Sequence, residues 1–94
     1  MARAIWNNTV IAESNAFHVV DGYVYFPLEN VKSEFLKPNS HTSVCFWKGT
    51  AEYFDVVVNG RAEVEAAWTY ANPARAAIRI KGHIAFWRGI KVER

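Results

Sequence analysis

The sequence predicts a small, mainly β domain made of several antiparallel hairpins. Short runs of β-branched and aromatic residues are repeatedly separated by pairs of residues that tolerate positive φ. The 94 residues suffice for one hydrophobic core but not for two domains. With 51% hydrophobic and 21% charged residues, the composition is typical of a folded protein and excludes a disordered chain. We therefore expect one domain over residues 1–94.

The first two hairpins follow from their turns. Asn7-Asn8 sets Trp6 opposite Thr9 in a short N-terminal hairpin. Asp21-Gly22 suits a type I′ turn, and this turn sets Val20 opposite Tyr23. Because side chains alternate along a strand, the second hairpin has a core face and an amphipathic face. The core face carries Phe17, Val19, Val24 and Phe26, and the amphipathic face carries His18, Tyr23 and Tyr25.

The segment between Pro27 and Pro38 has a different pattern. Leu28, Val31 and Phe35 recur at helical spacing, with an acidic start and a basic end. The prolines fit the boundaries of a helix better than its interior. The pattern predicts one short helix of two to three turns around residues 28–37.

Three further turns complete the predicted fold. Lys48-Gly49, Asn59-Gly60 and Arg88-Gly89 each predict a two-residue hairpin loop. The last of these would pair Trp87 with Ile90. The first would place Cys45 opposite Glu52 and gather a mixed set of side chains on one face: His41, Ser43, Cys45, Trp47, Thr50, Glu52 and Phe54.

This mixed face carries the candidate catalytic residues. Cys45, His41 and Glu52 are the residue types of a nucleophile, a base and an orienting group. Positions 41 and 45 would lie about 13 Å apart on a regular strand, so His41 needs a bend to reach the thiol. Glu52 alone would raise the pKa of the thiol. The alternative is that Cys45 is a half-buried, inert small hydrophobe.

The aromatic side chains are the candidate ligand-binding residues. Four Trp and four Tyr are many amphipathic rings for so small a chain. Most rings of this kind pack in cores, but some must line the surface or a concavity. There they can hold an apolar ligand, cage a cation or stack on a base.

The sequence also argues against several classes of function. The net charge of +2 is too small to predict nucleic-acid or membrane binding by itself. No spacing of His and Cys matches a metal site, and no glycine-rich phosphate loop is present, so we expect no metal and no cofactor. The lone Cys45 cannot form an internal disulfide, and no signal-peptide pattern is seen, so we expect a cytoplasmic protein.

The stretch from Ser40 to Tyr53 resembles the signature of a bacterial family, domain of unknown function 427 (DUF427). That signature reads Ser-x-Thr-x-Cys-Pro-aromatic-Lys-Gly-x-Ala-x-Tyr, and the resemblance extends over nearly the whole chain. One departure is Phe46, which stands where the family has proline, so the backbone after Cys45 is freer and gains an N–H donor. The family is sometimes labelled nucleotidyltransferase-like. The sequence lacks the paired acidic residues of metal-dependent nucleotidyl transfer, so we do not expect that activity.

The resemblance implies a compact fold of the β-tent kind, in which two small antiparallel sheets meet at an angle. It also implies a ligand groove lined by aromatic residues. The matching positions in this chain are Cys45, Trp47, Lys48, Tyr53, Trp68 and Tyr70.

Three functions remain open from the sequence. The first is binding of a small molecule or peptide by Trp47, Tyr53, Trp68 and Tyr70, with Lys48 as an anion anchor. The second is a thiol-dependent enzyme that uses Cys45. The third is a structural or oligomerisation module, since exposed strands pair between chains. We expect a monomer or homodimer, which light scattering at several concentrations would distinguish.

Overall fold

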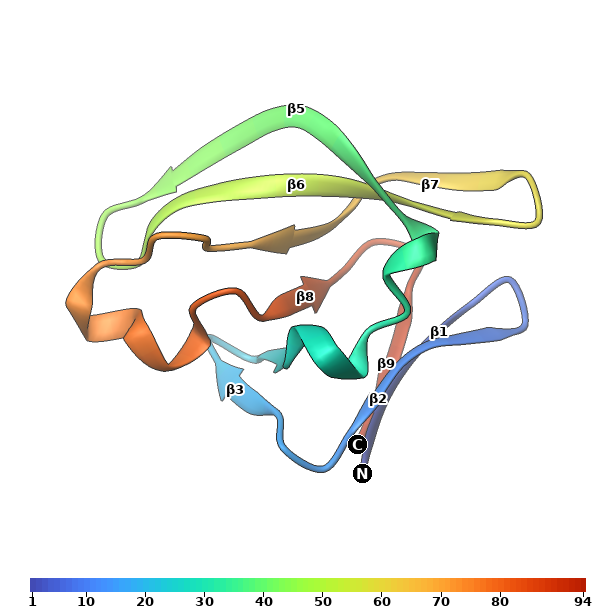
Figure 1. Ribbon diagram of the computed structural model, residues 1–94, viewed down its shortest axis with the longest axis horizontal. Helices are drawn as coiled ribbons and strands as arrows, with labels where there is room; N and C mark the ends of the chain where they lie inside the picture. Colours follow the sequence, from blue (N-terminus) through green and yellow to red (C-terminus); the bar gives the residue numbers. More distant parts are fainter.

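The structure, a computed structural model, describes residues 1–94 and contains two antiparallel sheets (Figure 1). The smaller sheet has the order β2-β1-β9, with β1 (Ala2–Trp6), β2 (Thr9–Ser14) and β9 (Lys91–Glu93). The larger has the order β3-β4-β8-β7-β6-β5. Its strands are β3 (His18–Val20), β4 (Tyr23–Phe26), β5 (Leu36–Cys45), β6 (Gly49–Val58), β7 (Arg61–Thr69) and β8 (Ile84–Phe86). The prediction of a mainly β fold with two antiparallel sheets is confirmed.

Helical structure is limited to short 3-10 turns. The predicted helix over residues 28–37 is replaced by two such turns, η1 (Leu28–Asn30) and η2 (Ser33–Phe35). Between them Val31 is extended and forms a β-bridge with Ala12, while the N–H of Lys32 donates to the carbonyl of Ile11. Pairing with β2 thus interrupts the helix. A third 3-10 segment, η3 (Arg75–Ile80), follows β7.

The two N-terminal hairpins have the predicted registers. Trp6 pairs with Thr9, and around Asp21 the pairs are Val20 with Tyr23 and His18 with Tyr25. On the expected core face Val24 and Phe26 are buried, but Val19 is exposed. On the opposite face Tyr25 is also buried, at only 1% exposed, whereas Tyr23 is exposed.

Each face of the six-stranded sheet carries its own hydrophobic cluster. The first cluster fills the space between the two sheets and includes Ala4, Ile11, Phe26, Val56 and Phe86. The second lies on the opposite face of the six-stranded sheet and is covered in part by η3. Its buried members are Val20, Tyr25, Ala51, Trp68, Tyr70, Ala77, Ile80 and Ala85. The second cluster contains most of the large amphipathic rings.

The predicted hairpin at Arg88-Gly89 is wrong. β8 pairs with β4 and β7, whereas β9 pairs with β1 in the other sheet, so the chain crosses between sheets here. Arg88 has a positive φ of 56° but Gly89 does not, which does not fit a type I′ turn. Gly89 instead donates its N–H to the Glu63 carboxylate at 2.8 Å. No helix of this fold has the length and apolar character needed to cross a membrane.

Candidate functional site: an aromatic pocket

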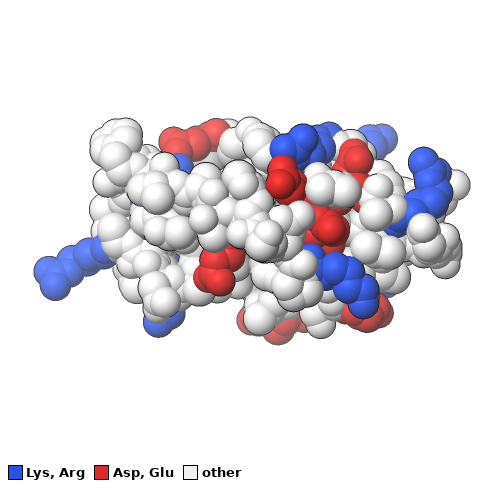
Figure 2. Space-filling view, turned by 90° about the horizontal axis from the view of Figure 1, so that it is seen from above, with Lys and Arg blue, Asp and Glu red and all other residues white.

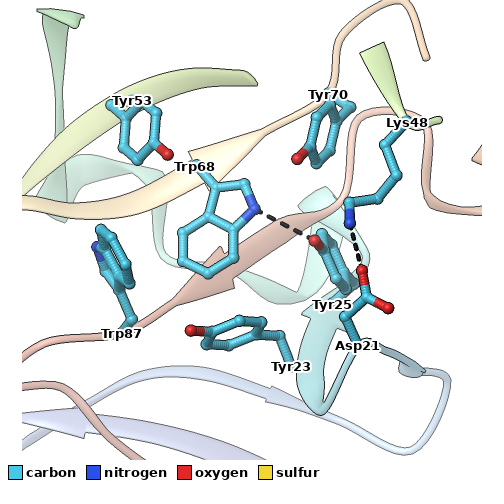
Figure 3. Close-up of a pocket in the computed structure, with 8 residues that line it drawn as sticks. All are labelled: Asp21, Tyr23, Tyr25, Lys48, Tyr53, Trp68, Tyr70 and Trp87. Atoms are coloured by element: carbon cyan, nitrogen blue, oxygen red, sulfur yellow. Dashed lines mark hydrogen bonds and ion pairs between the residues drawn. The ribbon is translucent and has the colours of Figure 1, made fainter. Parts of the chain in front are cut away.

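A pocket of about 170 Å³ lies on the second cluster (Figure 3). Six aromatic rings and one ion pair surround it. The lining residues are Asp21, Tyr23, Tyr25, Lys48, Tyr53, Trp68, Tyr70 and Trp87. They come from β4, β6, β7, the segments that follow β7 and β8, and two turns. The pocket therefore depends on strand pairing between distant parts of the sequence.

The floor of the pocket is one row of paired residues across four strands. Tyr25 of β4 pairs with Ala85 of β8, Ala85 with Trp68 of β7, and Trp68 with Tyr53 of β6. Directly paired residues point to the same face of a sheet. Because Ala85 is small and fully buried, Tyr25 and Trp68 can meet above it. The indole Nε1 of Trp68 donates to the Tyr25 hydroxyl at 3.2 Å.

Trp68 is the central ring of the pocket (Figure 3). Its centroid lies 4.9 Å from that of Tyr23 and 5.4 Å from that of Trp87, both in edge-to-face geometry. Tyr53 lies 6.3 Å from Trp68 at a tilt of 39°. Such offset and edge-to-face pairs are the arrangements that aromatic quadrupoles prefer. The rings hold one another in place while their remaining surfaces line the cavity.

Trp87 is fixed by a bulge in β7. Its Nε1 donates to the carbonyl of Glu65 at 2.6 Å. Glu65 has a positive φ of 56°, which is uncommon for a side chain of this kind. The Asp55 carboxylate accepts hydrogen bonds from the N–H of Glu65 at 2.9 Å and from Asn39 at 2.8 Å. Asp55 thus stabilises the backbone conformation that positions Trp87.

The other end of the pocket carries an ion pair. Lys48 donates from Nζ to the Asp21 carboxylate at 2.5 Å, which joins the β5–β6 turn to the β3–β4 turn. The Lys48 side chain is only 8% exposed, whereas that of Asp21 is 54% exposed. Lys48 also lies over the rings of Trp47, at 4.6 Å from the centroid, and Tyr70, at 5.9 Å. The ammonium is therefore enclosed by aromatic rings and faces a single carboxylate.

Burial and this ion pair determine the protonation states in the pocket. Burial by itself lowers the pKa of Lys48, but the hydrogen bond to Asp21 and nearby ionisable groups outweigh it and raise that pKa. Burial raises the pKa of Tyr70 to about 12. Burial also raises the pKa of Tyr25, against the lowering effect of its hydrogen bond from Trp68. At neutral pH the site thus holds a charged ammonium beside two neutral phenols.

The predicted register at Lys48-Gly49 is wrong. Cys45 pairs with Gly49 through a turn of three residues, 46–48, and Glu52 pairs with Thr42. A shift by an odd number of residues moves side chains to the other face of the strand. Cys45 therefore shares a face with Ser43 and the buried Ala51, while Glu52 is exposed on the opposite side. Cys45 and Glu52 do not form the predicted arrangement.

The structure gives Cys45 different neighbours. Burial tends to raise the pKa of the thiol, but the backbone N–H groups of Trp47 and Lys48 and the Lys48 ammonium outweigh it and lower the pKa of Cys45. The half-buried side chain packs against the second cluster beside Lys48. His41 is exposed, and its ring lies 4.6 Å from that of Tyr53.

Four of the five residues predicted to bind ligand line the pocket: Lys48, Tyr53, Trp68 and Tyr70. Trp47 does not line it, but packs under the Lys48 ammonium at its edge. Asp21, Tyr23, Tyr25 and Trp87 also line the pocket but were not predicted from the sequence. The amphipathic face predicted for Tyr23 and Tyr25 was the signal that could have identified two of them.

Charges elsewhere are dispersed. Figure 2 shows one face of the molecule, on which basic and acidic side chains lie interspersed and leave wide neutral areas. Three further ion pairs are Arg3 with Glu13, Arg88 with Glu65 at 3.3 Å, and Lys91 with Glu93 at 3.7 Å. No group of three or more His, Cys, Asp or Glu side chains comes together as metal ligands.

A search of curated proteins gives no significant match. A family model, in contrast, matches residues 1–94, the whole chain. The description of that family is domain of unknown function (DUF427), in agreement with the resemblance of the segment from Ser40 to Tyr53. This chain belongs to the DUF427 family.

Proposed function

We propose that this chain binds a small molecule, or a single side chain of a peptide, in the aromatic pocket. The observation that carries the proposal is the row Tyr25, Ala85, Trp68 and Tyr53, which presents rings around a cavity on a rigid sheet. Apolar cavities with a few convergent polar groups are typical ligand sites. Here the polar groups are Lys48, Asp21 and the tyrosine hydroxyls.

The pocket is the size of one ring. Its volume of about 170 Å³ is close to that of an engineered cavity of about 150 Å³ in another protein, which binds benzene. Larger ligands would have to extend from the mouth into solvent. A peptide would accordingly insert one side chain, and a small molecule one ring.

The test is a fragment screen followed by the indole N–H signals in NMR spectra. Binding in the pocket should shift the signals of Trp68 and Trp87, since both rings line it. Trp6 packs against the first cluster and serves as an internal control. The proposal is wrong if no fragment shifts Trp68 or Trp87, or if every fragment shifts Trp6 equally.

A pair of variants ties any binding to the pocket. Ala85→Val places two methyl groups on the floor between Tyr25 and Trp68 and should abolish binding. Ala4→Val is a matched control, because Ala4 is equally buried but lies in the first cluster. Overpacking costs about 1–3 kcal/mol in either case, so both variants lose stability. Only Ala85→Val should lose binding.

A second candidate function is thiol chemistry at Cys45. It is favoured by the lowered pKa of Cys45 and by the nearby Lys48 ammonium. The thiol would first lose its proton to solvent, with Lys48 stabilising the thiolate charge. The thiolate would then attack an electrophilic carbon, so that a C–S bond forms while the bond to a leaving group breaks and the leaving group departs with the electron pair. In this version Lys48 takes the role that the sequence assigned to Glu52 and His41. A reducing compartment such as the cytoplasm would keep the thiol free.

Alkylation by iodoacetamide as a function of pH tests this second function. We expect the rate to reach half its maximum below the ordinary thiol pKa of 9.0. Lys48→Met should move that midpoint upward, whereas the control Lys91→Met, which removes an exposed lysine, should not. A thiol that resists alkylation, or one with an unshifted midpoint, removes the thiol enzyme from consideration.

A further inference from the structure

We propose that the ligand of the pocket is a planar, single-ring carboxylate, and that Asp21 stands in for its carboxylate on Lys48. This inference rests on the proposed binding function and specifies the ligand class. The ring would lie among Tyr23, Tyr53, Trp68 and Trp87, and the carboxylate would point towards Lys48 (Figure 3). The intramolecular ion pair would then be exchanged for one with the ligand.

The Lys48 side chain is buried and held in place, whereas that of its partner Asp21 is exposed. The ammonium is held between the rings of Trp47 and Tyr70, and the carbonyl of Lys48 accepts a hydrogen bond from the N–H of Ala74 at 2.9 Å. Asp21 sits at the tip of a two-residue turn with more than half of its side chain in solvent. An exposed carboxylate of this kind becomes fully hydrated when it turns outward, so it can leave Lys48 at small cost.

Apart from Asp21, the polar groups near Lys48 in the pocket can donate hydrogen bonds. The hydroxyl oxygen of Tyr25 accepts from Trp68, which leaves its own proton free to donate. Tyr70 keeps its proton well above neutral pH and lies beside the ammonium. A carboxylate has about four acceptor positions and no donor, so it matches three donors that converge from Lys48, Tyr25 and Tyr70.

The remaining walls fit a flat apolar body. Tyr23 and Trp87 both meet Trp68 edge to face, and Tyr53 is tilted against both indoles. Rings in these orientations offer faces and edges to one additional ring. Aromatic walls also suit cations, but a cation in this cavity would lie close to the Lys48 ammonium. The fixed positive charge therefore favours an anion.

Asp21 consequently competes with the ligand. Two carboxylates on one ammonium repel each other, so a bound carboxylate gains affinity when the charge of Asp21 is removed. Asn is well suited to this turn, because position 21 has a φ of 53° and Asn tolerates positive φ. Asp21→Asn should therefore preserve the hairpin and strengthen binding, an effect opposite to that of most pocket substitutions.

Three probes of one shape and different charge test the ligand class: benzoate, benzamide and benzylammonium. Each is titrated against the intact chain, and the indole signals of Trp68 and Trp87 are followed. We expect benzoate to bind about tenfold more tightly than benzamide, the ratio expected of a charge-assisted contact, and benzylammonium to bind weakest. The inference is overturned if benzamide or benzylammonium binds as well as benzoate, while the proposed binding function stands.

Two variants with matched controls test the role of the ion pair. Asp21→Asn should tighten benzoate binding about fivefold relative to benzamide binding, whereas Glu13→Gln, the same charge change in the exposed pair with Arg3, should not alter that ratio. Lys48→Met should reduce benzoate to the level of benzamide, and Lys91→Met should not. Weaker benzoate binding by Asp21→Asn contradicts the competition. If none of the three probes shifts either indole, this inference fails, and the wider fragment screen decides the binding function.

Discussion

The hydrogen bond between Trp68 and Tyr25 offers a direct measurement of what holds the pocket together. Trp68 is 6% exposed and Tyr25 is 1% exposed, so both side chains are largely shielded from bulk water. Trp68→Phe keeps an aromatic ring at the centre of the pocket but removes the N–H donor. It leaves the Tyr25 hydroxyl buried without the donor at 3.2 Å.

Two terms set the expected cost. Loss of one ring of the indole creates a small cavity, for which we take about 1–2 kcal/mol by comparison with other large-to-small changes. A buried hydroxyl left without its partner costs about 1–3 kcal/mol. The sum is about 2–5 kcal/mol, compared with about 5–14 kcal/mol of total stability for a domain of this length. The variant should fold, with a clearly lower Tm.

A double-mutant cycle separates the two terms. In a Tyr25→Phe background no hydroxyl remains to be left without a partner, so Trp68→Phe should cost only the cavity term. We expect the two costs of Trp68→Phe to differ by about 1–3 kcal/mol, the hydroxyl term, when measured by guanidinium unfolding. A coupling energy below about 0.3 kcal/mol, within the usual additivity of distant sites, would refute the reasoning. The pocket would then be held by ring packing alone.

Three other predictions concern pH, a turn and the bulge. Because burial raises the pKa of Tyr70 from 10.0 to about 12, its contribution to stability is present below pH 10 and is lost as the pH rises to about 12. Tyr70→Phe should remove the step at highest pH from the absorbance titration of the tyrosines. Gly49→Ala should cost about 1–3 kcal/mol of stability, because Gly49 has a φ of 113°, which alanine rarely adopts. The added Cβ would meet Ala74 and Asn72 only at ordinary contact distances, so the cost arises from the backbone conformation. A smaller loss in thermal unfolding would show that another backbone conformation is accessible. Asp55→Ala should broaden or shift the Trp87 indole signal by releasing the Glu65 bulge, and an unchanged signal would show that the bulge forms without the carboxylate.

Local turn chemistry explains which hairpins could be predicted from sequence. Asn7, Asn8, Asp21 and Gly22 all adopt positive φ, as a type I′ turn requires, and the registers that follow from them are correct. Lys48 does not adopt positive φ, and the chain uses a three-residue turn instead. Its carbonyl bonds to Ala74 and its side chain to Asp21, so contacts from distant segments determine this turn.

The pocket was only partly predictable for the same reason. Alternation along β4 places Tyr23 and Tyr25 together, and aromatic surplus marks Trp68 and Tyr53 as candidates. What joins them is the insertion of β8 between β4 and β7, a pairing between segments about 60 residues apart that no local pattern encodes. The small side chain of Ala85 is as important to the cavity as the rings, yet an alanine gives no sequence signal.

The pairing of β1 with β9 brings the first and last residues of the chain close together. Arg3 lies opposite Glu93, and both chain ends lie side by side at one edge of the molecule (Figure 1). A short peptide linking residue 94 to residue 1 would span little distance, and new ends could be opened at the exposed Asn59-Gly60 loop without cutting a strand. A circularly permuted chain should thus keep the pocket, with β1 and β9 joined by the linker.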